Sequence, residues 1–258
     1  MLDIDDYFDT IPTIFKENRE KHIDLNKLIL DSINDIADLM KSDKISDEVI
    51  ELLKNIHSIR RKIFLCSYLL NINEYEWAVS SLRSLVESIE TVLIFMIYPN
   101  ELYKALRFIQ PDGFKKFEDE QSKLRKKLKE KYDQNPSIIQ KLERLKFFRG
   151  EFSSSWAHSN YLMNHAYSHQ DNSKAWDNDY VMTDNGLYDD ELYVILNIYL
   201  LKIIYLFLDV FFELENDSIF SPIIFTELWK ERLALANSKI KHLQSQYSSI
   251  RQQELFNL

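Results

Sequence analysis

Residues 187–214 read LYDDELYVILNIYLLKIIYLFLDVFFEL and form the most apolar stretch of the chain. Within them, the 23 residues 192–214 are long enough to cross a bilayer as one helix. The same stretch contains Asn197, Lys202, Asp209 and Glu213, and three acidic residues stand at its beginning. Because charged side chains are costly inside a membrane, we expect the central helix of a soluble bundle rather than a membrane span.

The composition of the whole chain also favours helices. Its 258 residues include only three glycines and five prolines, the residues that build the tight turns of sheets. We therefore expect an all-α fold, a single helical-bundle domain of eight or nine helices. The helices over 73–98 and 187–214 should form its core.

Capping residues and apolar spacing predict the first three helices. Residues 10–12, with a proline suited to a first turn, should start a helix that continues to Leu39. Ser46 is the expected N-cap of the next helix, which residues 71–73 should end. Asn73 and Glu76 resemble a capping box for a third helix that ends at Tyr98, before a proline.

The second half of the chain alternates helices with polar connections. Residues 111–113 predict a turn before a basic helix, and residues 135–136 predict the start of another helix that ends near Gly150. Residues 170–186 indicate a long polar loop. A last helix should start at residues 221–222 and finish in a polar C-terminal helix extension, 237–258.

Charge is distributed unevenly along the chain. The net charge of −9 opposes nonspecific binding to nucleic acid, yet residues 115–149 carry twelve Lys/Arg against six Asp/Glu. This segment is either a solvated helical hairpin or a surface for RNA or an acidic protein partner. The lone Cys66 and the acidic start MLDIDDYFDT predict a cytoplasmic protein without disulfides or a signal peptide.

Residues 149–169, RGEFSSSWAHSNYLMNHAYSH, hold three of the six histidines. On a helix, Glu151, Ser155, His158, His165 and His169 would fall close to one line. His165 and His169 have the spacing of two metal ligands, although the glutamate of the zinc motif is missing. His158 could act as a base with Ser154 or Ser155, or with an arginine in metal-independent RNA cleavage. Alternatively, the histidines are hydrogen-bonded surface residues.

The helix over 73–98 carries a polar stripe beside its apolar one. Arg83 and Glu87 stand four residues apart and can pair, and the helix turns apolar all round after Thr91. The stripe therefore either faces an interior groove or forms an exposed ion pair. If it is buried, Glu87→Ala should destabilise the fold by about 3 kcal/mol.

Two short motifs resemble a known pattern. The segments RSLVE at 83–87 and FSSSWAH at 152–158 are similar to motifs of uncharacterised bacterial all-helical proteins, which are distantly related to HEPN-type domains. Several HEPN-type proteins are RNases in toxin–antitoxin or antiphage systems. The resemblance implies a site formed by Arg83, Glu87, Ser154 and His158. The HEPN signature arginine shortly before the histidine is absent, because Arg149 stands nine positions before His158.

These observations lead to two hypotheses of function. The first is a HEPN-like cytoplasmic bacterial effector, of the toxin or antiphage-defence type, that acts on RNA through a groove at Arg83, Glu87 and His158; if it is an enzyme, it is a metal-independent ribonuclease. The second is a non-enzymatic interaction module in which these residues form a buried structural network. Neither requires a cofactor, and a homodimer is compatible with both. Both place Arg83 or Glu87 within hydrogen-bond reach of His158 or Ser154.

Overall fold

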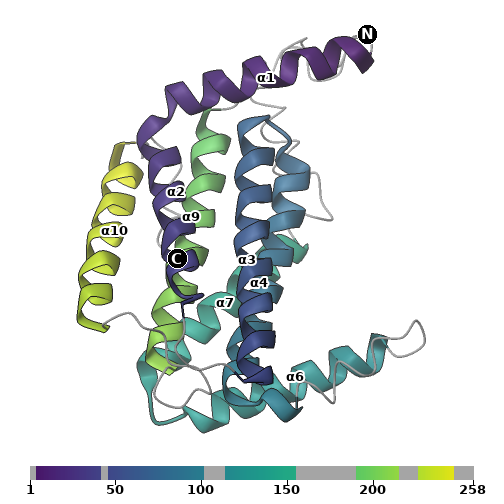
Figure 1. The fold of residues 1–258 in the computed structure, drawn as a ribbon, viewed down its shortest axis with the longest axis vertical. Coiled ribbons are helices and arrows are strands. Elements are labelled where there is room, and N and C mark those ends of the chain that lie inside the picture. Colours follow the sequence, from purple (N-terminus) through teal and green to yellow (C-terminus); the bar gives the residue numbers. More distant parts are fainter. Residues whose placement is uncertain (1–3, 42–45, 102–113, 155–189, 215–225, 247–258) are drawn as a thin grey trace.

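The computed structural model describes residues 4–41, 46–101, 114–154, 190–214 and 226–246, and all regular structure in these segments is helical. The predicted all-α bundle is therefore confirmed (Figure 1). The helices are α1 (Ile4–Lys21), α2 (Ile23–Asp38), α3 (Asp47–Asn71), α4 (Tyr75–Ile97), α6 (Phe114–Lys131), α7 (Pro136–Ser154), α9 (Asp190–Leu214) and α10 (Thr226–Gln246).

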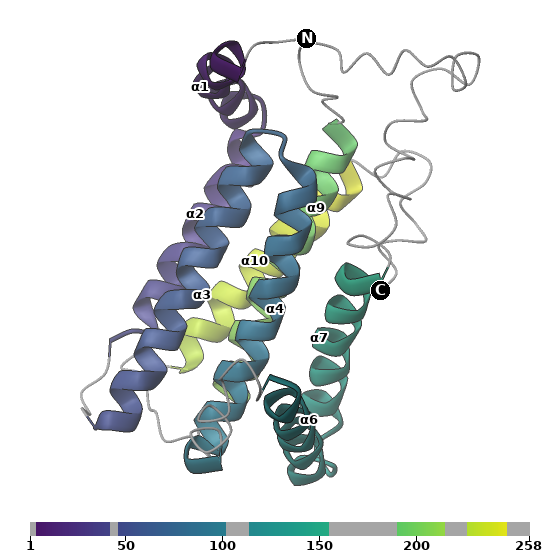
Figure 2. The same cartoon turned by 90° about the vertical axis from the view of Figure 1, so that its right-hand side faces the viewer.

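Helix α9 lies at the centre of the bundle. It packs against α2, α3, α4, α7 and α10 (Figures 1 and 2). Its apolar part, Tyr193–Leu214, is 78% buried, although by length and composition it is the one described helix that could cross a membrane. This burial is expected of a core helix, whose apolar surface is removed from water by its neighbours.

Two charged residues of α9, Asp209 and Glu213, have a partner in α7. Lys141 Nζ lies 2.8 Å from Asp209 Oδ2 and 2.5 Å from Glu213 Oε1, and Ser137 donates a hydrogen bond to the same Glu213 oxygen. The two carboxylates therefore stand at the α7–α9 contact, where a lysine balances them.

The hairpin of α3 and α4 confirms one predicted cap and corrects another. The Ser46 side chain accepts a hydrogen bond of 3.3 Å from Val49 N, as an N-cap does. The predicted capping box at Asn73 and Glu76 is wrong, since Asn73 has a φ of 62° and Glu74 is the N-cap, without a side-chain bond. An N-cap needs an extended backbone, whereas Asn73 adopts the left-handed turn conformation that asparagine tolerates.

The N-terminal region differs from the prediction of one helix starting at residues 10–12. Helix α1 begins at Ile4 with Pro12 in its interior, and a break at His22 separates it from α2. Helix α1 crosses the end of the bundle, whereas α2 runs along it (Figure 1). Asn18 fixes this bend, because its amide donates hydrogen bonds of 2.9 Å to Asn71 O and Asn73 Oδ1 in the α3–α4 turn.

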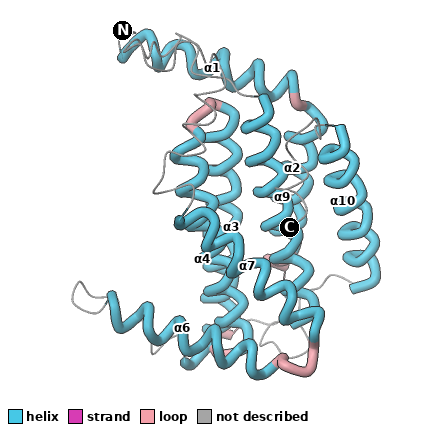
Figure 3. The backbone as a smooth tube through the Cα atoms, turned by 180° about the vertical axis from the view of Figure 1, so that it is seen from behind, coloured by secondary structure: helices cyan, strands magenta, loops and turns pink. Residues whose placement is uncertain are grey.

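Helices α6 and α7 both pack against α4, α7 alongside it and α6 at its lower part (Figure 2). Asn135 Oδ1 accepts a hydrogen bond from Ile138 N, so the predicted start of α7 is confirmed. Its predicted end is wrong, because α7 continues past Gly150 to Ser154. Helix α10 packs on α9 away from α6 (Figure 3). The predicted loop 170–186 lies outside the described residues, as does the end of the extension 237–258 beyond residue 246.

Candidate anion-binding groove

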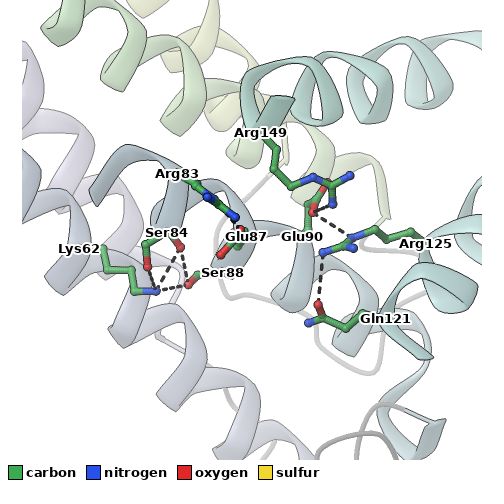
Figure 4. Close-up of polar contacts among 9 residues, drawn as sticks. All are labelled: Lys62, Arg83, Ser84, Glu87, Ser88, Glu90, Gln121, Arg125 and Arg149. Carbon is green, nitrogen blue, oxygen red and sulfur yellow. Dashed lines mark hydrogen bonds and ion pairs between the residues drawn. The ribbon is translucent and has the colours of Figure 1, made fainter. Parts of the chain in front are cut away.

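The polar stripe of α4 divides between three surroundings (Figure 4). Ser84 and Ser88 face Lys62 of α3, Arg83 pairs with Glu87 on α4 itself, and Glu90 meets two arginines of α6 and α7. Helical spacing accounts for the grouping of Ser84 with Ser88 and of Arg83 with Glu87, because positions four apart share a face. Glu90 lies one turn after Glu87 on the same face, and its surroundings differ because arginines of α6 and α7 reach it.

The pair of Arg83 and Glu87 is partly exposed to solvent. Arg83 Nε donates a hydrogen bond of 3.1 Å to Glu87 Oε1, and the two side chains are 40% and 44% exposed. An exposed pair of this spacing contributes a few tenths of a kcal/mol. Of the two alternatives for Arg83 and Glu87, the structure therefore shows the exposed ion pair.

Lys62 joins α3 to α4 through the two serines. Its Nζ donates to Ser84 Oγ at 2.8 Å, to Ser84 O at 3.1 Å and to Ser88 Oγ at 2.5 Å. Partial burial lowers the pKa of Lys62, and the nearby Glu87 carboxylate opposes that shift. An ammonium has three N–H donors, and the three acceptors fully occupy them. This arrangement is suited to holding two helices together.

Glu90 receives two guanidinium groups from two different helices. Its Oε2 accepts a hydrogen bond of 2.7 Å from Arg149 Nη1 of α7, and Arg125 Nε of α6 lies 3.0 Å from the same oxygen. The Glu90 residue is only 8% exposed, and both arginine side chains are about three-quarters buried. Three helices therefore converge on one carboxylate.

The second contacts of Arg125 fix its orientation. Its Nη2 donates a hydrogen bond of 3.3 Å to Gln121 Oε1 (Figure 4). The Gln121 amide in turn donates a hydrogen bond of 3.2 Å to Thr91 Oγ1. Burial lowers the pKa of Arg125, and the Glu90 carboxylate opposes the shift. Arginine remains charged at any ordinary pH. The guanidinium is thus a fixed positive charge in a partly buried position.

A pocket of about 240 Å³ opens beside Glu90, Arg125 and Arg149, between α4, α6 and α7. We call it the α4–α6–α7 groove. Aliphatic side chains line one part of it: Leu93, Ile94, Leu128, Leu142 and Leu145. The rest of its lining is polar: Ser122, Lys126, Lys129 and Lys146, with the three charged residues already named.

The groove carries an excess of positive charge. Five basic side chains and one acidic side chain line it. Glu143, outside the lining, pairs with Lys129 and lies 3.9 Å from Lys146, so it offsets part of this excess. An apolar wall beside fixed guanidinium groups is suited to an anion that also has an apolar part.

The histidine half of the predicted site lies outside the described residues. This applies to Ser155, His158, His165 and His169, and the side chain of Ser154, at the end of α7, is also not described. The predicted contact of Arg83 or Glu87 with His158 or Ser154, and the predicted metal ligands, therefore stay predictions.

Sequence reasoning missed the grouping of Glu90 with Arg125. The available signal was the position of Glu90 one turn before the all-apolar end of α4, which implied burial and hence a cationic partner. The excess of basic residues in 115–149 supplied the candidates. Which of these twelve lysines and arginines contacts Glu90 depends on how α6 and α7 pack against α4. No local sequence pattern indicates this packing.

Two further polar clusters occur elsewhere in the described part. Asn26, Asn71 and Tyr193 exchange hydrogen bonds of 2.9–3.1 Å at the end of the bundle, where His22 stacks on Tyr193. Arg232 of α10 lies 3.3 Å from a carboxylate oxygen of both Asp35 and Asp38 on α2. In the first cluster the three side chains hydrogen-bond to one another, which indicates a structural role. The second cluster connects α10 to α2 by ion pairs.

No protein-family model, curated protein or solved structure matches this chain. The functional argument therefore rests on the chemistry of the α4–α6–α7 groove.

Proposed function

We propose that this chain is a cytoplasmic, HEPN-like all-helical effector that binds RNA, and that the α4–α6–α7 groove contacts the phosphates. The observation that carries the proposal is the pair of guanidinium groups, from Arg125 and Arg149, that the buried Glu90 carboxylate holds beside an open pocket.

The arrangement of the three charges favours an anionic ligand. Five basic side chains and one acidic side chain line the groove, so its lining carries an excess of positive charge. The Arg125 guanidinium has five N–H donors in a planar fork, and the contacts described for it, with Glu90 and Gln121, use two of them. The arginines are oriented before the ligand arrives, which reduces the entropy lost on binding.

The surrounding charge favours a phosphate polymer over an isolated anion. Residues 115–149, which include most of α6 and α7, carry an excess of six positive charges, while the rest of the chain sums to −15. A polyanion should therefore follow α6 and α7 and avoid the remaining surface. An acidic protein segment would meet the same charges, but it would not use the aliphatic wall as a nucleobase can.

Ribonuclease activity is the second part of the proposal, and it depends on His158. The resemblance to HEPN-type proteins supports RNA as the substrate. If His158 moves the proton during cleavage, His158→Ala should retain RNA binding and stability and should abolish cleavage. A variant that still cleaves RNA at the wild-type rate would remove His158 from the mechanism.

The binding proposal can be tested with matched charge reversals. Lys126 and Lys146 line the groove, whereas Lys123 and Lys131 are exposed on α6 outside its lining. Lys126→Glu/Lys146→Glu and Lys123→Glu/Lys131→Glu change the net charge equally. We expect the groove variant to lower RNA affinity by about tenfold or more. The slope of log affinity against log salt concentration should become shallower by about 0.7 for each phosphate that the variant no longer binds.

The control variant separates specific contacts from overall charge. It should lower the affinity by less than the groove variant, and both should unfold at the wild-type denaturant concentration. Equal reductions for the two variants would mean that RNA responds only to the net charge of α6. No RNA binding by the wild-type chain, together with binding of an acidic peptide, would support an interaction module instead.

The interaction module is the second candidate function, and one observation favours it. The Glu90 group connects α4, α6 and α7, as a purely structural ion-pair network would. In that case the groove has no ligand of its own. The proposed network of Arg83, Glu87 and His158 gains no support from Arg83 and Glu87, which are partly exposed.

A further inference from the structure

We infer that the α4–α6–α7 groove takes the phosphorylated end of an RNA strand: one terminal nucleotide, with its phosphomonoester on Arg125 and Arg149. The inference rests on the proposed RNA binding and specifies the part of the RNA that the groove binds.

The size of the pocket limits what can enter. Its volume of about 240 Å³ is slightly below the range of about 300–1,000 Å³ typical of sites that enclose whole drug-sized ligands. Proteins that hold the interior of a strand use long basic channels that follow several nucleotides. A pocket of this size is suited to a single nucleotide, as a chain end offers.

The charge of the pocket favours a terminal phosphate over an internal one. An internal phosphodiester carries one negative charge, whereas a phosphomonoester carries about −1.5 to −2 at pH 7, with a second pKa of about 6. Five basic side chains and one acidic side chain line the groove. A second negative charge on the ligand strengthens its attraction to this excess, and the extra oxygen provides another acceptor for the arginine forks.

The aliphatic wall provides a place for the base of the same nucleotide. It consists of leucine and isoleucine side chains and includes no aromatic ring among the described lining residues. The base would therefore be buried against aliphatic carbon rather than stacked. A base inside a duplex is already stacked and paired, so an unpaired end is required. Since Ser122 is the only neutral polar side chain described in the lining, little discrimination between bases is expected.

The test compares one RNA oligonucleotide in three forms, with a 5′-phosphate, with a 3′-phosphate and with neither, by fluorescence anisotropy on the full chain. We expect one phosphorylated form to bind about tenfold or more tightly than the unphosphorylated form. This advantage should shrink between pH 7 and pH 5, as the phosphomonoester loses its second charge. Equal affinities for the three forms at pH 7 would overturn the inference.

A competitor and two variants complete the test. A nucleoside monophosphate should displace the phosphorylated strand at lower concentrations than those that displace the unphosphorylated strand. Displacement of both strands at the same concentrations would count against a terminal site. Ser122→Trp, at the exposed edge of the groove, and Lys126→Gln/Lys146→Gln should each reduce the advantage of the terminal phosphate. Lys123→Gln/Lys131→Gln should leave it unchanged.

Failure of the inference can be distinguished from failure of the proposed function. If the groove variants weaken RNA binding but the terminal phosphate makes no difference, RNA binding stands and the terminal site is wrong. If neither the groove variants nor the terminal phosphate affects RNA binding, both are wrong.

Discussion

Glu87 and Glu90 are three positions apart on α4 and have opposite surroundings. Glu87 pairs with Arg83 on its own helix, and its side chain is 44% exposed. Glu90 is 8% exposed and contacts arginines from two other helices. The energetic role of a carboxylate depends on its solvation, so the two residues should respond very differently to the same substitution.

Glu90→Ala should therefore lower the free energy of unfolding by about 3–5 kcal/mol, because it removes the buried carboxylate that two partly buried guanidinium groups contact. Glu87→Ala is the matched control and should cost less than about 1 kcal/mol. Urea unfolding followed by circular dichroism measures both. Similar decreases for the two variants would show that Glu90 does not organise α4, α6 and α7.

Asp35 provides a prediction on pH. Burial raises the pKa of its carboxyl from 3.8 to about 6, although Arg232 opposes the shift. The folded state thus binds the proton more tightly than the unfolded state, so the contribution of Asp35 to stability is present at low pH and is lost as the pH rises from about 4 to 6.

Asp35→Asn cannot titrate and should remove this dependence. Between pH 4 and pH 6, the wild type should lose stability relative to Asp35→Asn, by on the order of 2 kcal/mol. Denaturant unfolding at intervals of half a pH unit measures the difference. A wild type that gains stability relative to the variant over this range would show the assigned sign to be wrong.

At the scale of helices, one lysine of α7 pairs with two carboxylates of α9. Lys141, whose side chain is 16% exposed, stands between Asp209 and Glu213. Lys141→Met keeps most of the apolar stem and removes the charge, so two carboxylates remain together between the helices. We expect a decrease of about 1–3 kcal/mol in the free energy of unfolding.

Lys54→Met is a suitable control for Lys141→Met. Lys54 pairs with Glu51 on the exposed face of α3, and this substitution should cost less than about 1 kcal/mol. Thermal unfolding of both variants, followed by circular dichroism, makes the comparison. If Lys141→Met were as stable as the wild type, the charges of α9 would need another explanation.

The elements that sequence predicted well are those that local chemistry determines. Ser46 and Asn135 cap α3 and α7 through side chains within a few residues, and the long apolar stretch with its few charges identified α9 as the core helix. The errors occur where residues far apart in the sequence determine a backbone conformation or an ion-pair partner. Asn73 is held in its turn by Asn18, 55 positions away, and Glu90 is paired with Arg149, 59 positions away. Neither pairing leaves a local pattern.

At the scale of the molecule, basic and acidic residues gather in different regions, and other helices enclose the most apolar one. The basic helices α6 and α7 pack against α4 (Figures 1 and 2). The acidic residues Asp35 and Asp38 of α2 instead contact Arg232 of α10. Helix α9 is enclosed by five other helices. We expect the purified chain to remain in solution without detergent. Gel filtration with light scattering will test this and will show whether the chain forms a homodimer. Recovery of the chain only in detergent would contradict the expected burial of α9.

The most direct measurement of the central claim is photo-crosslinking of a 4-thiouridine-substituted RNA to the full chain, followed by peptide mapping. If the α4–α6–α7 groove contacts RNA phosphates, the crosslinked peptides should come from residues 122–129 of α6 and 142–149 of α7. The Lys126→Glu/Lys146→Glu variant should lose these crosslinks, and Lys123→Glu/Lys131→Glu should keep them. Crosslinks confined to α2 and α10, or crosslinks in α6 and α7 that the groove variant leaves unchanged, would contradict the claim.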